Sequence, residues 1–124
     1  IVPLQPSYLS TKGLDILFKS VSRIRKTINP TLRIDGILLT MVGSRTINAR
    51  SIISSLKATI GQNIRVFDTE IPHSVRAVEC ALSGGSIYAY DKQGKVAHAY
   101  ERFTKEVEEL EKRTKDRLRN DGVR

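Results

Sequence analysis

Ile37 to Thr46 reads Ile-Leu-Leu-Thr-Met-Val-Gly-Ser-Arg-Thr, an apolar run that passes directly into a Gly-Ser turn and then an arginine. A similar succession follows at Ile71 to Glu79, Ile-Pro-His-Ser-Val-Arg-Ala-Val-Glu. Short apolar runs of this kind are typical of strands buried in a parallel sheet. Ligands of open α/β sheets bind at the carboxyl ends of such strands. We therefore predict that Arg45 and Arg76 are functional residues.

The hydrophobic pattern predicts three strands separated by single amphipathic helices. The strands are expected at 1–5, 34–42 and 64–71. Ser10-Thr11 is the expected cap of the first helix, and Gly61 is the expected end of the second. The apolar stripe of the first helix should comprise Leu14, Leu17, Val21, Ile24 and Ile28. Such β-α-β units predict an α/β fold, a three-layer, mostly parallel sheet with flanking helices and right-handed crossovers.

The remainder of the chain is predicted to be mainly helical. A short helix or turn is expected around Val75 to Leu82, then a break at Gly84-Gly85 and a brief extended segment at Ile87 to Tyr90. A long helix should begin at about Lys95. Its predicted apolar face comprises Val96, Tyr100, Phe103, Val107 and Leu110. Beyond Leu110 the helix is expected to continue as a polar, charged extension.

Composition limits the possible functions. The 124 residues contain no run of 18 apolar residues, which predicts one globular domain or part of one, without a membrane span or signal peptide. The lone Cys80 excludes an internal disulfide, fits a reducing cytosol, and is interpreted as a small buried thiol. Together with His73 and His98 it gives no metal-ligand spacing, and no catalytic constellation is present.

The positive charge belongs to the body of the chain. The formal net charge is +8 and the isoelectric point is near 9.9. Residues 1–100 carry 13 Lys and Arg against 6 Asp and Glu, whereas residues 101–124 carry 8 against 7. This balance favours a polyanionic partner for the folded part, with a merely basic surface as the alternative.

Three parallel strands would leave two open sheet edges, which invite pairing with further strands. We interpret the chain as the second half of a larger α/β domain. The alternative is an autonomous small domain that dimerises through its edge.

At this point a family resemblance can be stated, carried by motifs in unbroken order over roughly residues 1–110. They are Val2-Pro3-Leu4-Gln5, Tyr8, Gly13-Leu14, Gly36-Ile37-Leu38-Leu39-Thr40-Met41, Ser44-Arg45-Thr46, Ile71-Pro72, Val75-Arg76, Glu79 and Tyr90-Asp91. In this order they resemble the C-terminal half of ParA/Soj-type partition ATPases. Residues 111–124 form a polar, charged extension of the last helix, which resembles ParA-like proteins of mobile elements.

The resemblance implies a deviant P-loop ATPase that dimerises with ATP, coats DNA non-specifically and releases it when a ParB-like partner stimulates hydrolysis. It implies ATP and Mg in the full-length parent, and a bacterial, cytoplasmic and nucleoid-associated role in chromosome, plasmid or mobile-element partitioning.

By position in the family, Arg45 and Arg76 are DNA-backbone contacts. Arg50, Lys92 and Lys95 are further candidates, and Lys19 and Arg23 could widen the same patch. In relatives, the two strand ends that here finish at Met41 and at Pro72-His73 line the adenine pocket. The alternative for Met41 and Pro72 is a packing or turn role.

The sequence also departs from the family pattern. Relatives have an acid where Ser7 stands, an Asp at Gly43, Arg-Asn at His73-Ser74, and Ala-Pro at Cys80-Ala81. The phosphate-binding G-x-x-x-x-G-K-[ST] motif is absent, and in the family it lies in the N-terminal half. We therefore expect this chain to be inactive as an ATPase alone and to bind no cofactor tightly. The second hypothesis is a stand-alone basic module that binds DNA or protein without nucleotide chemistry.

Overall fold

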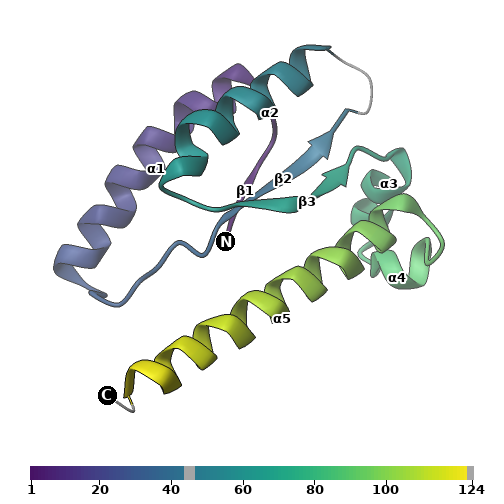
Figure 1. The fold of residues 1–124 in the computed structure, drawn as a ribbon. Coiled ribbons are helices and arrows are strands. Elements are labelled where there is room, and N and C mark those ends of the chain that lie inside the picture. The colour runs from purple at the N-terminus through teal and green to yellow at the C-terminus, as the bar shows by residue number, and fades with distance from the viewer. Residues whose placement is uncertain (44–46, 123–124) are drawn as a thin grey trace. The chain divides into compact units, whose positions relative to one another are not determined.

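Three parallel strands form the sheet, as predicted. A computed structural model of the chain describes residues 1–43 and 47–122. The strands are β1 (Val2–Leu4), β2 (Ile37–Val42) and β3 (Val66–Pro72), in the order β1-β2-β3 (Figure 1). Central β2 is the most apolar of the three, and its Ile37 and Leu39 are fully buried.

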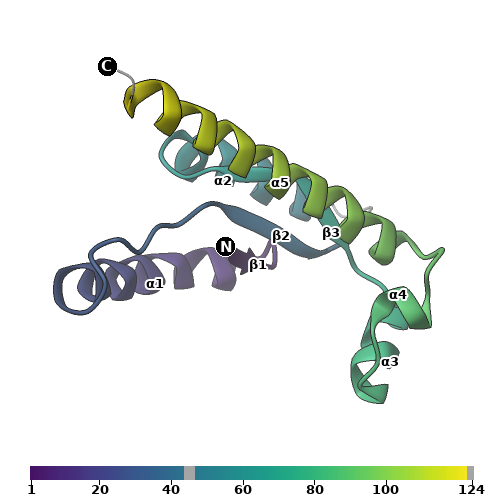
Figure 2. The same ribbon diagram turned by 90° about the horizontal axis from the view of Figure 1, so that it is seen from below.

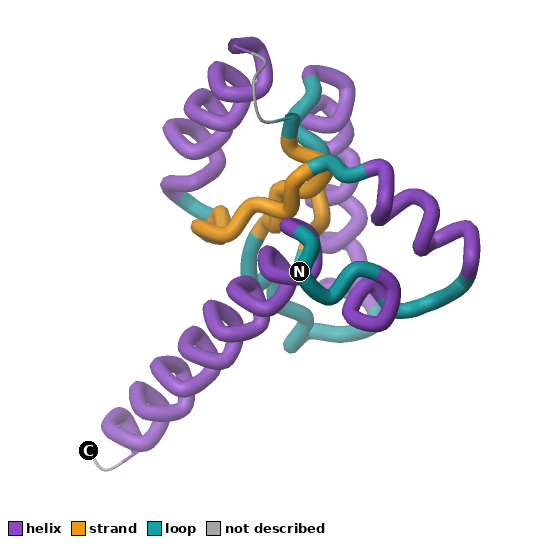
Figure 3. The backbone as a smooth tube through the Cα atoms, turned by 90° about the vertical axis from the view of Figure 1, so that its right-hand side faces the viewer, coloured by secondary structure: helices purple, strands orange, loops and turns teal. Residues whose placement is uncertain are grey.

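Two helices connect the strands and cover the same face of the sheet. They are α1 (Tyr8–Thr27) and α2 (Ile47–Thr59), and α2 is extended by the single 3-10 turn η1 (Ile60–Gln62) (Figures 1 and 3). This placement follows from two successive right-handed crossovers in one direction along the sheet. The core between the helices and the sheet consists of Leu4, Leu14, Ile37, Leu39, Val42, Ile53 and Leu56.

The start of α1 differs from the prediction. The cap is Ser7 rather than Ser10-Thr11, because Ser7 is in an extended conformation and its Oγ accepts a hydrogen bond from Ser10 N at 3.3 Å. The Thr11 backbone and side chain both donate to the Ser7 carbonyl oxygen, which closes the first helical turn. Ser10 and Thr11 therefore lie inside the helix.

The predicted apolar stripe of α1 is buried only in part. Leu14 is buried and Phe18 packs against the core, but Ile28 is 78% exposed, and Leu17 and Ile24 are more than a third exposed. A helix of 20 residues is about 30 Å long, whereas the three-residue strand β1 spans only about 10 Å. The sheet therefore covers only part of α1.

The α-helix α2 ends at Thr59, so Gly61 occupies the predicted position two residues after the last helical residue, although its φ is not positive. The chain tightens at Ile60 into η1, and Asn63 N donates to the Ile60 carbonyl oxygen at 3.0 Å. Gly84 is the one glycine with a positive φ, +72°, among the described residues.

The chain divides into two compact units, Ile1–His73 and Ser74–Arg124. The second unit contains α3 (Val75–Ser83), α4 (Ile87–Tyr90) and the long α5 (Lys95–Gly122), and α4 contacts both of the other helices (Figure 2). Gly84 caps the C-terminus of α3 and confirms the predicted break. None of the helices in the described part of the chain combines the length and apolar character that crossing a bilayer requires.

The segment Ile87–Tyr90 is helical, which corrects the prediction of an extended segment. Ser86 accepts a hydrogen bond from Tyr88 N at its Oγ, and Asp91 N donates to the Ile87 carbonyl oxygen at 2.9 Å. Ile and Tyr favour strands locally. The cap at Ser86 and the contacts with α3 and α5 override this preference.

Cys80 is a buried thiol, as predicted. It is 3% exposed, and its Sγ donates to the Gly85 carbonyl oxygen at 3.2 Å. Ser83 Oγ in turn donates to the Cys80 carbonyl oxygen at 2.9 Å. The thiol thus helps to hold the turn that separates α3 from α4.

Candidate functional site

The three residues predicted to contact adenine lie together at the carboxyl end of the sheet. Val42 pairs with Pro72 at the ends of β2 and β3, and His73 N donates to the Val42 carbonyl oxygen at 3.1 Å. Met41 precedes Val42 and is 51% exposed. The carboxyl ends of parallel strands meet at one edge, so residues 30 positions apart in sequence form a single surface here.

The backbone of Met41 is strained. Its φ is +50°, a left-handed conformation that costs a residue with a side chain on the order of 1–3 kcal/mol. The register between β2 and β3 shifts between Leu39 and Val42, so the strain belongs to an irregularity of the ladder. Such irregularities re-aim side chains, and this one leaves Met41 half-exposed beside the strand ends.

Arg50 is held by an acidic partner. From α2, its guanidinium makes two hydrogen bonds to the carboxylate of Glu70 on β3, at 3.2 and 2.9 Å. The arginine side chain is 54% exposed and that of Glu70 is 21% exposed. A bidentate pair orients the guanidinium and neutralises most of its charge. As a candidate DNA contact, Arg50 is therefore less available than its sequence position suggests.

Arg76 lies in the first turn of α3 and is held on two sides. Its Nε is 3.0 Å from Asp91 Oδ2, and its Cζ is 5.6 Å from the centroid of the Tyr90 ring. The side chain is nevertheless 59% exposed. The carboxylate and the aromatic face reduce the freedom of a long side chain while leaving much of the guanidinium facing solvent.

Tyr90 connects Arg76 to a second carboxylate. Its hydroxyl donates to Glu79 Oε2 at 3.1 Å, and this hydrogen bond raises the pKa of the Tyr90 hydroxyl, with the nearby Arg76 opposing the shift. The hydroxyl therefore stays protonated, and a donor, at neutral pH. We call Arg76, Glu79, Tyr90 and Asp91 the Arg76 cluster.

A side chain at Gly94 would displace the Asp91 carboxylate from its position beside Arg76. Gly94 N donates to the Asp91 carbonyl oxygen at 2.9 Å, and a Cβ at Gly94 would overlap the Asp91 carboxylate. Lys92 and Lys95 stand on either side of this contact, and both are exposed. The second unit thus brings Arg76, Lys92 and Lys95 into one region, although they come from three different elements.

The structure places the predicted site residues in two groups. Met41, Arg50, Pro72 and His73 belong to the first unit, and Arg76, Lys92 and Lys95 belong to the second. Arg45 lies outside the described residues. Sequence reasoning missed the part of Asp91 in orienting Arg76, although Tyr90-Asp91 is one of the motifs of the resemblance.

The resemblance stated above implies bound ATP and magnesium, and the residues described here can be compared with what those ligands need. Met41, Pro72 and His73 offer an apolar and aromatic edge that fits a base ring. Magnesium is different, because the described residues contain no group of three His, Cys, Asp or Glu that could hold a metal ion. The described residues thus include no candidate magnesium site, and the adenine contact through Met41, Pro72 and His73 stays a prediction.

The three-stranded parallel sheet with its flanking helices makes this chain an α/β protein. Its architecture is consistent with part of a P-loop-type domain. No family model matches the chain. It is 36% identical over 107 residues to the chromosome-partitioning ATPase Soj of Thermus thermophilus. The aligned segment covers 86% of this chain and 42% of that protein.

Two further relatives agree. Soj of Treponema pallidum is 34% identical over 106 residues, 86% of this chain and 41% of the relative. The chromosome partitioning protein ParA of Caulobacter vibrioides is 32% identical over 106 residues, which cover 86% of this chain and 39% of that relative. The chain is a homologue of the ParA/Soj partition ATPases and matches their C-terminal part. It spans about two fifths of the length of these relatives.

Proposed function

We propose that this chain is the C-terminal part of a ParA/Soj-like partition ATPase and carries non-specific DNA contacts. The observation that carries the proposal is the similarity to partition ATPases over 86% of the chain. The charge distribution supports it, since residues 1–100 hold more than twice as many cations as anions. Non-specific DNA binding depends mainly on such cations, because each phosphate contact releases condensed counterions.

Within this proposal Arg76 is the leading described DNA contact. It is 59% exposed, and Asp91 contacts its guanidinium at Nε, whereas Glu70 accepts hydrogen bonds from both terminal nitrogens of Arg50. Lys92 and Lys95 are further candidate DNA contacts. Arg45 is another, because it follows β2 in the sequence as Arg76 follows β3. Arg50 is a weaker candidate because Glu70 binds its guanidinium.

The nucleotide chemistry belongs to the whole ATPase. When ATP and Mg are bound in the full-length protein, the residues of this chain that would contact the nucleotide are Met41, Pro72 and His73, at the base. The remaining proposals follow from the family: a homodimer, a ParB-like partner, and a nucleoid-associated location in the cytoplasm of a bacterium.

Arg76→Ala is expected to weaken binding of non-specific duplex DNA about fivefold at 0.1 M salt. The slope of log K against log salt should become shallower by about 0.9, because one phosphate contact is lost. Fluorescence anisotropy across a salt series measures both quantities. The double variant Arg45→Ala/Arg76→Ala should lower the slope by about twice as much.

Arg65→Ala is the matched control. It also removes an exposed arginine side chain, but Arg65 lies just before the first residue of β3, whereas Arg76 follows the last. It should leave the slope close to that of the wild type. Equal slopes for Arg76→Ala and the wild type would remove Arg76 from the interface. Absence of any binding by the wild-type chain in low salt would contradict the proposed function of the chain itself.

Asp91→Asn is expected to tighten DNA binding about threefold at low salt. The Asp91 carboxylate competes with a phosphate for Arg76, and an exposed charge pair contributes about 0.2–1 kcal/mol. Asparagine keeps the shape of the side chain while removing its charge. Glu109→Gln is the control, because it neutralises the acidic partner in the exposed Arg113–Glu109 pair on α5. Unchanged or weaker binding by Asp91→Asn alone would contradict competition at Arg76.

A further inference from the structure

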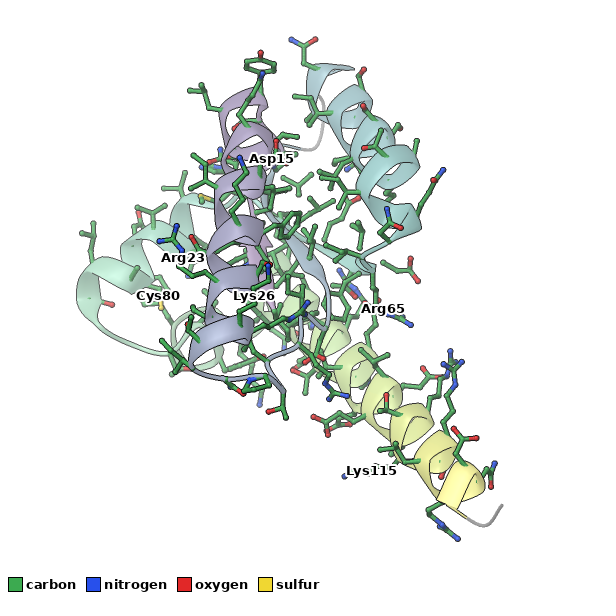
Figure 4. The ribbon with its side chains drawn as sticks, turned by 90° about the vertical axis from the view of Figure 1, so that its left-hand side faces the viewer. Asp15, Arg23, Lys26, Arg65, Cys80 and Lys115 are labelled. Atoms are coloured by element: carbon green, nitrogen blue, oxygen red, sulfur yellow. The ribbon has the colours of Figure 1, made fainter. Side chains whose placement is uncertain are left out.

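A row of cations on α1 is used by none of the contacts described above. Lys19, Arg23 and Lys26 follow one another at spacings of four and three residues, so they lie within about 60° of one another around the helix. With Ser22 and Thr27 they line an open hollow of about 310 Å³. We call these five residues the α1 basic face. Figure 4 shows Arg23 and Lys26 projecting from α1.

This charge is not balanced locally. Helix α1 contains five Lys and Arg and a single acid, Asp15. Among the described residues, no carboxylate lies within 4.0 Å of a charged nitrogen of Lys19, Arg23 or Lys26. Like charges at these spacings destabilise a helix by a few tenths of a kcal/mol per pair. An anion on this face would remove that repulsion.

The spacing of the cations fits a phosphate backbone. Seven residues of helix separate Lys19 from Lys26, a rise of about 10 Å. One strand of B-DNA advances 3.4 Å along the duplex axis per phosphate, so a row of this length aligned with the axis covers the axial rise of about three phosphates. The Ser22 hydroxyl can donate a further hydrogen bond.

The composition of the face argues against other anionic partners. All five lining residues are polar, whereas protein interfaces are anchored mainly by buried aromatic and apolar side chains. A helix that binds a membrane surface likewise inserts apolar side chains beside its cations. The exposed Ile16 stands one turn before Lys19 on α1, so vesicle binding is measured as the alternative. A row of cations and hydroxyls is typical of contacts to nucleic-acid phosphates.

We infer that the α1 basic face is a second DNA-phosphate contact surface, located in the first unit and separate in sequence from the Arg76 cluster of the second. This inference rests on the proposed function, since it assigns an additional surface to the same DNA-binding activity. It adds Lys26 and Ser22 to the candidate DNA contacts. It also assigns Lys19 and Arg23 to the α1 basic face rather than to the patch around Arg45 and Arg76.

The test compares two triple variants of the whole chain. Lys19→Gln/Arg23→Gln/Lys26→Gln removes the charges of the α1 basic face. Lys112→Gln/Lys115→Gln/Arg119→Gln removes the same charge from exposed positions of similar spacing on α5. Binding of a non-specific DNA duplex is measured for both variants and the wild type across a salt series, and circular dichroism verifies that helix content is unchanged.

The α1 variant should bind DNA at least tenfold more weakly than the wild type at 0.1 M salt, and its log-log salt slope should be shallower by about two to three. The α5 variant should keep a slope near that of the wild type. Equal behaviour of the two triple variants would overturn the α1 surface while leaving DNA binding through Arg76 intact.

Two other results would also overturn the inference. If the wild-type chain binds no DNA at low salt, the proposed function fails together with the second surface. If the α1 variant keeps its DNA affinity but no longer binds vesicles of phosphatidylcholine and phosphatidylserine, the face contacts membrane phosphates instead. Loss of DNA binding with vesicle binding unchanged supports the inference.

Discussion

Phe67→Ala is expected to lower the free energy of unfolding by about 3–5 kcal/mol, a large fraction of the 5–15 kcal/mol typical of a domain. Phe67 is fully buried and, with Ile37 and Leu39, is among the largest side chains that no solvent reaches. Removing its ring loses both the transfer free energy and the close packing around it. Urea unfolding followed by circular dichroism measures the loss.

Leu9→Ala is the control for this result. Leu9 is 80% exposed on α1, so truncating it should change the stability by less than about 0.5 kcal/mol. A loss of less than 1 kcal/mol for Phe67→Ala would mean that β3 does not hold its ring in a packed core.

Gly36→Ala should destabilise the chain by about 1–3 kcal/mol through overpacking. A Cβ at this position would lie 2.6 Å from Phe67 Cε2 and 3.1 Å from the Arg65 carbonyl oxygen. The ring belongs to a fully buried side chain and the oxygen to the backbone just before β3, where it accepts a hydrogen bond from Ile37 N, so neither can move away cheaply. Thermal or urea unfolding of the variant measures the effect.

A double-mutant cycle identifies the cause of that loss. In the Phe67→Ala background the added methyl group has room, so Gly36→Ala should then cost less than half as much. Gly13→Ala is the matched control, because nothing lies within 4 Å of a Cβ at Gly13, inside α1. It should stabilise the chain by about 0.5–1 kcal/mol through helix propensity. Equal costs of Gly36→Ala in both backgrounds would show that the ring is not the obstacle.

Local sequence patterns were sufficient to predict most of the fold. Apolar runs bounded by turn residues identified all three strands, and alternation with amphipathic helices predicted that they are parallel. The family resemblance, rather than these patterns, implied that Met41, Pro72 and His73 would be neighbours, and Val42 pairs with Pro72 in the structure. Predictions failed where a segment was short, as at Ile87–Tyr90, or where the sheet was too narrow to cover α1.

The order of strands and helices, the excess of positive charge and the similarity to partition ATPases all follow from the amino-acid sequence alone, because hydrophobic periodicity, charge and motif order can be read along the chain without its fold. Which of the cations are paired with a carboxylate depends on the tertiary structure. Arg50 reaches Glu70 twenty residues later, and Arg76 reaches Asp91 fifteen residues later. No local pattern specifies such pairs, since they form only when packing brings separate elements together. The same packing leaves the α1 basic face without an acidic partner among the described residues.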